Sequence, residues 1–230
     1  MTDEQLTAGD VARMRTPLWE QAKTAIAQAR PGEAAALIDR AVEQWSALKD
    51  YSINWITSLL TFIGEELGEE AVERALRKTG EEFVRPRRDT GTDWGSLPAA
   101  ARAKVIARAM LANMGAVEVA EDDEKIVLSF RCGSGGKLVD DGRYDGEHAY
   151  LRLRERGPRT LMRDELWVYC AHCSVNNEMQ PVEWGGTPTS VEYPPEHPGE
   201  PCVHHIYKDV TKLPPEAYER IGKRAPNADA

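Results

Sequence analysis

The chain has 230 residues, of which 41% are apolar and 29% charged, so it is long enough for a real core and has an ordinary globular composition. Its formal net charge of -9 argues against broad binding to nucleic acid or an anionic membrane, which both attract basic surfaces. No run of about 18 apolar residues occurs and the acidic start MTDEQLTAGD is unlike a secretory signal. We therefore expect a cytoplasmic protein without nucleic-acid or membrane partners.

The first 115 residues are predicted to be helical. One helical segment ends at Pro31-Gly32, and a second covers residues 32–51. In a third, apolar side chains recur on one helical face until Gly68, and a further amphipathic helix then continues to Phe83. The sequence therefore predicts an N-terminal half built almost entirely from helices.

A basic cluster, RPRR at residues 85–88, opens a loop rich in Pro, Gly and Asp, and we interpret it as a solvated connector. Ser96 is the predicted N-cap of the next helix, which ends at Gly115. We divide the chain into a helical extension over residues 1–50 and an α+β domain over residues 51–230.

At residue 116 the apolar period changes from that of a helix to that of a strand. AVEVA and KIVLSFRC alternate on either side of EDDE, which predicts a β-hairpin. This alternation places Cys132 where the apolar face of the second strand ends. A glycine-rich loop, GSGGKLVDDGRYDGEH, follows, and AYLRLRER is expected to hold a short strand.

The segment LWVYCAHCSVNNEMQPVEWGG is predicted to begin extended and to continue as a helix to Glu178 or Met179, with Pro181 at or just past its end. TSVEY and CVHHIYK are further predicted strands, separated by a proline-rich loop, and LPPEAYERIGKRA is a closing helix. The order of elements predicts an α+β fold: a helical N-terminal half followed by a mainly antiparallel sheet with a packed helix.

The cysteines lie in three separated segments. Cys132 ends a strand, Cys170 and Cys173 share one side of a helix, and Cys202 opens a strand on which His204 shares its face. Folding is expected to bring them together at one edge of the sheet.

Three interpretations of this set remain open. Four thiolates, or three with His172 or His204, are ligands for a zinc ion or an iron-sulfur cluster, with Cys132, Cys170, Cys173 and Cys202 as the candidates. The cysteines are also typical of buried thiols that pack as small apolar groups. Alternatively, Cys132 or Cys170 is a nucleophile that needs no metal.

For a catalytic site, the candidate residues are Cys132 as nucleophile, His172 or His204 as proton carriers, and Glu178 as a base. The glycines after Cys132 are expected to present backbone N–H groups to a substrate, which makes Gly133, Gly135 and Gly136 candidate substrate-binding residues.

The order of LGEEAVERALRKTGEEF, the hairpin VEVAEDDEKIVLSFRC, a cysteine-bearing helix and a strand that opens with cysteine resembles the L-2-amino-thiazoline-4-carboxylic acid hydrolase-like family. That family is similar to the small-molecule-binding domains named after 4-vinyl reductase. The resemblance covers roughly residues 58–208, with Cys132 and Cys202 at the positions of family cysteines. CGSGG, YCAHC and CVHHIYKD depart from it. It implies opening of a cyclic C–N/C–S amidine by thiol chemistry.

We therefore expect a hydrolase or lyase that acts on a small sulfur- or nitrogen-containing molecule at a Cys/His centre, with or without a metal. The alternative is a non-catalytic binding or sensing module with a zinc or iron-sulfur site. Two roles are open for the helical first 50 residues: they cover the domain, or they pair with a second copy to form a homodimer.

Overall fold

The computed structural model describes residues 7–88 and 93–225. The chain divides into two compact units, an N-terminal unit of residues 1–52 and a C-terminal unit of residues 53–230. The first residues of the predicted first helix, the middle of the loop after RPRR and the C-terminal tail lie outside the described residues. No helix among the described residues is long and apolar enough to cross a membrane.

The N-terminal unit is built from α1 (Ala8–Arg15), α2 (Leu18–Ala27) and the first part of α3 (Pro31–Leu67). Thr7 caps α1 in a capping box with Asp10. Pro31, predicted as a stop, is instead the first residue of α3, where a proline loses no helical hydrogen bond. The break expected near residue 51 is also absent, because α3 runs on to Leu67 without interruption.

In the C-terminal unit, α4 (Glu69–Thr79) continues into a π-helix, η1 (Gly80–Val84), and then into α5 (Arg85–Arg88). A short 3-10 helix, η2 (Trp94–Ser96), precedes α6 (Ala99–Ala112). The N-cap of α6 is Pro98 and not Ser96, whose hydroxyl donates to the Asp93 carbonyl. The RPRR segment is helical and is not a connector.

The main sheet is antiparallel, with strands β1 (Val117–Glu121), β2 (Lys125–Phe130), β6 (Cys202–Tyr207) and β5 (Val191–Tyr193) in that spatial order. β1 and β2 form the predicted hairpin, with Val117 opposite Phe130. A separate two-stranded sheet pairs β3 (Arg152–Leu153) with β4 (Leu166–Trp167). The predicted α+β fold is confirmed.

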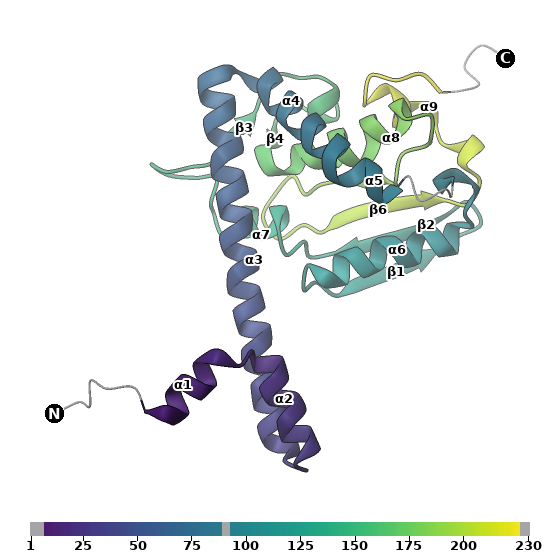
Figure 1. The fold of residues 1–230 in the computed structure, drawn as a ribbon. Helices are drawn as coiled ribbons and strands as arrows, with labels where there is room; N and C mark the ends of the chain where they lie inside the picture. Colours follow the sequence, from purple (N-terminus) through teal and green to yellow (C-terminus); the bar gives the residue numbers. More distant parts are fainter. Residues whose placement is uncertain (1–6, 89–92, 226–230) are drawn as a thin grey trace. The chain divides into compact units, whose positions relative to one another are not determined.

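Helix α6 packs along one face of the main sheet (Figure 1). The contact buries the α6 side chains Ala103, Ile106 and Met110 against Leu128 and Ile206 of the strands. It follows the alternation of β2, whose even-numbered residues are buried and whose odd-numbered residues are half-exposed.

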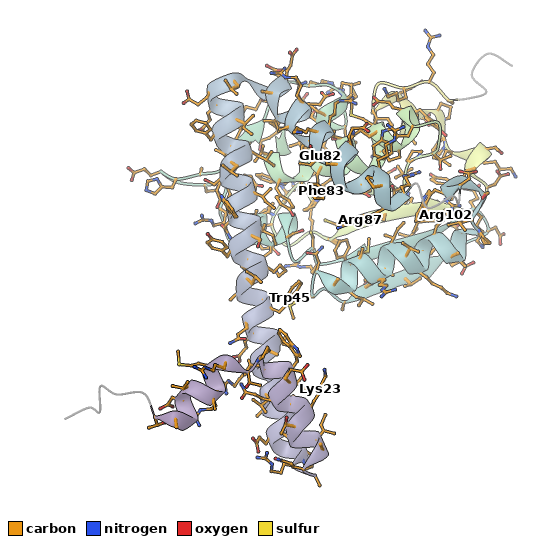
Figure 2. The ribbon with its side chains drawn as sticks, viewed as in Figure 1. Lys23, Trp45, Glu82, Phe83, Arg87 and Arg102 are labelled. Carbon is orange, nitrogen blue, oxygen red and sulfur yellow. The ribbon has the colours of Figure 1, made fainter. Side chains whose placement is uncertain are left out.

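Arg102 links the same helix to the end of β6. Its guanidinium, which Figure 2 labels, donates to the carbonyls of Leu97 and Tyr207.

The chain between the strands is more helical than predicted. The glycine-rich loop contains α7 (Gly135–Asp140). After β4 come the 3-10 helix η4 (Val168–Cys170), the π-helix η5 (Cys173–Met179) and α8 (Gln180–Glu183). Pro181 was expected at or just past the end of a helix that reaches Glu178 or Met179. It lies just past the end of η5, in the first turn of α8, where its missing N–H costs little. The remaining short elements are η3 (Pro158–Thr160), η6 (Val210–Lys212) and α9 (Pro215–Glu219).

Candidate active site

A cavity of about 660 Å³ in the C-terminal unit brings all four cysteines together. The π-helix η5, the loop after β2, strands β5 and β6, helix α6 and α5 form its walls. Its polar lining residues are Arg87, Arg88, Asn113, Ser134, His172, Asn177, Thr189, Glu192 and His204. A volume of this size suits a small organic molecule, and a mainly apolar wall with a few polar groups is typical of a ligand site.

Cys132 lies two residues beyond β2 and is half-buried. Its Sγ is 3.1 Å from the Ser134 hydroxyl. Cys202 is a further hydrogen-bond partner, and this bond is the main cause that lowers the pKa of Cys132 well below that of an ordinary thiol. Burial opposes the shift, while Ser134 and the backbone groups of Ser134 and Gly136 reinforce it.

The hydrogen bond between Cys132 and Cys202 acts on both thiols. The same hydrogen bond, together with burial, raises the pKa of Cys202. We assign the negative charge to Cys132 because the Ser134 hydroxyl and nearby backbone groups also favour its thiolate. Cys132 is the one thiol of the four whose pKa is lowered.

Two glycines allow the loop after β2 to approach the sulfur atoms closely. A Cβ atom on Gly135 would lie 2.8 Å from Cys170 Sγ, and one on Gly136 would lie 3.0 Å from the Cys132 Cβ. Gly135 lines the cavity, whereas Gly133 and Gly136, also predicted to bind substrate, are not among its lining residues. The glycines thus serve first to pack the loop against the cysteines.

Cys170 is fully enclosed, and burial raises the pKa of its thiol beyond the neutral range. It is the last residue of the 3-10 helix η4. Cys170 thus lines the cavity as a buried thiol, and its raised pKa favours Cys132 over Cys170 as the candidate nucleophile.

Cys173 is paired with His172. The imidazole Nδ1 of His172 lies 2.6 Å from the Tyr169 carbonyl oxygen, so Nδ1 carries the proton and Nε2 is an acceptor. Nε2 lies 3.7 Å from Cys173 Sγ. Burial, followed by the charge of Glu192, raises the pKa of Cys173 well above its usual range. The hydrogen-bond partners of this thiol are His172 and Glu192.

A second polar group lies on the facing strands β5 and β6. Glu192 is paired with His204 in the register of these strands, and its Oε1 lies 3.4 Å from His204 Nδ1. The Ser190 hydroxyl is 3.0 Å from the same nitrogen, and Asn177 donates to Glu192 Oε2 at 3.2 Å. These contacts fix the His204 ring beside Phe130, with ring centroids 5.7 Å apart.

Glu178, predicted as a base, does not line the cavity. Its Oε1 accepts from the Glu192 backbone N–H at 2.7 Å and from Arg220. Burial raises the pKa of Glu178 to about 8, against the opposing charge of Arg220. Glu178 therefore connects η5 to β5 through this hydrogen bond. The carboxylate that lines the cavity is that of Glu192.

Two arginines of the RPRR cluster reach the cavity as well. Arg88 donates to the Thr189 hydroxyl at 2.9 Å and to the Thr187 carbonyl at 2.8 Å, and lies over the ring of Trp94. Arg87, labelled in Figure 2, is exposed and also lines the cavity. The opposite wall is apolar and comes mainly from α6, with Val105, Ile106, Ala109 and Met110.

Glu192, Ser190 and both arginines belong to the site but were not predicted from the sequence. The sequence does indicate where Glu192 and Ser190 lie. Both belong to TSVEY, the predicted strand that precedes the strand with His204 in the chain. Only the sheet order, which pairs β5 with β6, shows that Glu192 and His204 meet.

The thiols do not form a ready metal site. Within residues 7–88 and 93–225, no three His, Cys, Asp or Glu side chains are grouped as an ion would require. A zinc ion or cluster would therefore need the side chains to draw together around it.

Comparisons with known proteins give no relative. No family model, no curated protein and no solved structure matches the chain.

Proposed function

We propose that the chain is an enzyme that opens a small electrophilic molecule by attack of the Cys132 thiolate. The position of this sulfur carries the proposal: it lines the cavity and has Ser134 and Cys202 as hydrogen-bond partners. A thiolate is the reactive form of cysteine, and enzymes prepare it with nearby donors or positive charge.

The substrate class comes from the resemblance seen in the sequence, which implies a cyclic amidine with ring nitrogen or sulfur. In the proposed reaction, Cys132 Sγ forms a bond to the amidine carbon, and the ring C–N or C–S bond breaks. The leaving atom keeps the bonding electrons and takes a proton from an imidazolium. Water then attacks the same carbon, which releases the Cys132 thiolate and returns a proton to the imidazole.

His204 is the better placed of the two candidate proton carriers. Its Nδ1 is engaged by Ser190 and Glu192, so Nε2 is the nitrogen available to a bound molecule. His172 is occupied on both sides, by the Tyr169 carbonyl and by Cys173. We therefore assign proton transfer to His204 and the orientation of Cys173 to His172.

The alternative proposal is a non-catalytic module that holds zinc or an iron-sulfur cluster. The donor set supports it, because four thiols and two imidazoles line one cavity and soft thiolates suit both groups. The candidate ligands are Cys132, Cys170, Cys173 and Cys202, with His172 or His204. If such a group is bound, it supplies Lewis-acid or redox chemistry beside the apolar wall.

One preparation of the full chain separates these proposals. Iodoacetamide at neutral pH, followed by peptide mapping, is expected to label Cys132 much faster than the other thiols, with no stoichiometric zinc or iron by elemental analysis. Cys132→Ser is expected to abolish the fast phase, and Cys173→Ser, the matched control, to retain it. One equivalent of metal with protected thiols would support the alternative. No metal and no reactive thiol before denaturation would reject both.

Turnover is tested with a panel of small cyclic amidines, including 2-aminothiazolines, by following ring opening. Cys132→Ser and His204→Phe are each expected to lose at least about 100-fold in kcat/KM. We also propose that the chain is a homodimer, because its N-terminal helices expose large apolar side chains.

A further inference from the structure

The N-terminal unit carries its larger apolar side chains on the outside. Between α2 and α3 it buries Leu18, Ala22, Ala25, Ala34 and Leu37. On its surface, seven large side chains are between 45% and 65% exposed: Trp19, Ile26, Ile38, Val42, Trp45, Leu48 and Tyr51. Single exposed apolar residues are normal, but a patch of this extent usually marks a binding surface.

Most of these side chains border one groove. Trp19 and Ile26 of α2 face Ile38, Val42 and Trp45 of α3 across a groove of about 370 Å³. The small side chains of Ala22 and Ala41 also line it. Figure 2 labels Trp45 on α3 and Lys23 on α2, and Lys23 is the charged lining residue. The groove can therefore accept an apolar side chain from another helix.

The size of the patch matches what a stable dimer needs. Seven side chains that each expose about half of a roughly 200 Å² surface present on the order of 700 Å². A specific interface buries about 800 Å² on each partner. The hairpin thus offers nearly one full side of an interface.

The spacing along α3 is that of a helix that packs on another helix. Ile38, Ala41, Trp45 and Leu48 follow the alternating steps of three and four that form a heptad seam. The spacing continues in the sequence to Trp55, Leu59 and Phe62, which are between 50% and 60% exposed in the C-terminal unit. Apolar residues that repeat every seven positions along a helix favour packing against another helix.

The charges of the hairpin allow a second copy to approach. Residues 7–52 hold six acidic side chains (Asp10, Glu20, Glu33, Asp39, Glu43, Asp50) and six basic ones (Arg13, Arg15, Lys23, Arg30, Arg40, Lys49), so their formal charges cancel. Two neutral hairpins do not repel each other. Membrane-surface helices differ, since they carry an excess of Lys and Arg toward anionic lipids.

We infer that the hairpin of α2 and the first part of α3 is a self-association surface, on which the hairpin of a second copy seats to form a four-helix arrangement. In a two-fold dimer each copy uses the same patch, so each covers the groove of the other. This deepens the proposed homodimer and does not depend on the chemistry proposed at Cys132.

Light scattering after size-exclusion chromatography of the full chain tests this inference. The expected mass is twice the 25.6 kDa of one chain. Ile38→Glu combined with Trp45→Glu would bury four unpaired charges per dimer and is expected to weaken association at least about 100-fold, giving a monomer. Glu43→Lys changes the charge of the same helix away from the groove and is expected to leave the dimer intact.

Circular dichroism and the labelling rate of Cys132 report whether each variant stays folded, so a loss of association is distinguished from a loss of fold or of the proposed function. A monomeric full chain, or a doubly substituted chain that remains dimeric, would overturn the inference. Sedimentation of the full chain with phosphatidylcholine and phosphatidylserine vesicles, lost in the double variant, would show instead that lipid covers this surface.

Discussion

The two units of the chain differ in the size of the apolar side chains that they bury. The C-terminal unit encloses large ones, such as Leu128, Leu153, Ile206 and Ile221, at 1% exposure or less. The N-terminal unit, over residues 7–52, buries three alanines and two leucines and leaves its tryptophans on the surface. A closed core that also surrounds a cavity can support chemistry. An open hairpin of this composition is the surface on which we propose that a second copy binds.

Buried polar groups show the same contrast. In the C-terminal unit, Glu178, Gln180 and Glu192 are nearly inaccessible and hydrogen-bonded. The buried side chains described between residues 7 and 52 are all apolar. Burying polar groups is costly unless they are hydrogen-bonded. The C-terminal unit therefore depends on the hydrogen bonds of these three buried side chains.

The largest expected effect is the loss of stability when a buried side chain of the C-terminal unit is shortened, compared with an exposed side chain of the N-terminal unit. Leu128→Ala removes a buried side chain and is expected to lower the free energy of unfolding by about 3 kcal/mol, measured by urea denaturation. Leu48→Ala removes an exposed one and is expected to act only through association, so its effect grows with protein concentration. Equal, concentration-independent losses in the two variants would contradict the difference between the units.

The next largest expected effect is a change in the pKa of Cys132, measured by its labelling rate. Ser134→Ala removes a hydroxyl from Cys132 Sγ and is expected to raise the apparent pKa of Cys132 labelling by about one unit, which slows labelling about tenfold at acidic pH. Because the native pKa is lowered, the wild-type rate stays level at neutral pH and falls only on acidification. Ser129→Ala, on the opposite side of β2, is the control. An unchanged pH dependence of Cys132 labelling in Ser134→Ala would show that this hydroxyl does not lower the pKa of Cys132.

The predictable part of the fold comes from local patterns. The β1–β2 hairpin, the β5 and β6 strands and the break at Gly68 follow from alternation, helical period and glycine. The unpredicted parts depend on tertiary contacts. The π-helix η5 is an example, since Asn176 and Gln180 are held by carbonyls of Leu76 and Arg77 about a hundred residues earlier.

The candidate site was predictable to a similar extent. The strand pattern placed Cys132 where an apolar face ends and Cys202 at the start of a strand, and both line the cavity. The role of Glu192 could not be predicted, because its meeting with His204 depends on which strands are neighbours. Glu178 was predicted as a base, but it accepts hydrogen bonds from the Glu192 backbone and Arg220 and does not line the cavity.

The smallest expected effect concerns Cys173. Burial is the main cause of its raised pKa, and the charge of Glu192 is the second. Glu192→Gln removes that charge and is expected to speed Cys173 labelling several-fold at alkaline pH, while Cys132 remains the faster thiol. Peptide-resolved labelling measures both sites at once. Unchanged Cys173 labelling would show that burial alone controls this thiol.

The most direct test of the central claim is the ultraviolet absorbance of thiolate in the native full chain, compared with Cys132→Ser across pH. The account predicts one thiolate per chain between about pH 6 and 7, where an ordinary thiol of pKa about 8.5 is protonated, and none in the variant. Absorbance that appears only at alkaline pH, with the same profile in both proteins, would contradict a preformed thiolate at Cys132.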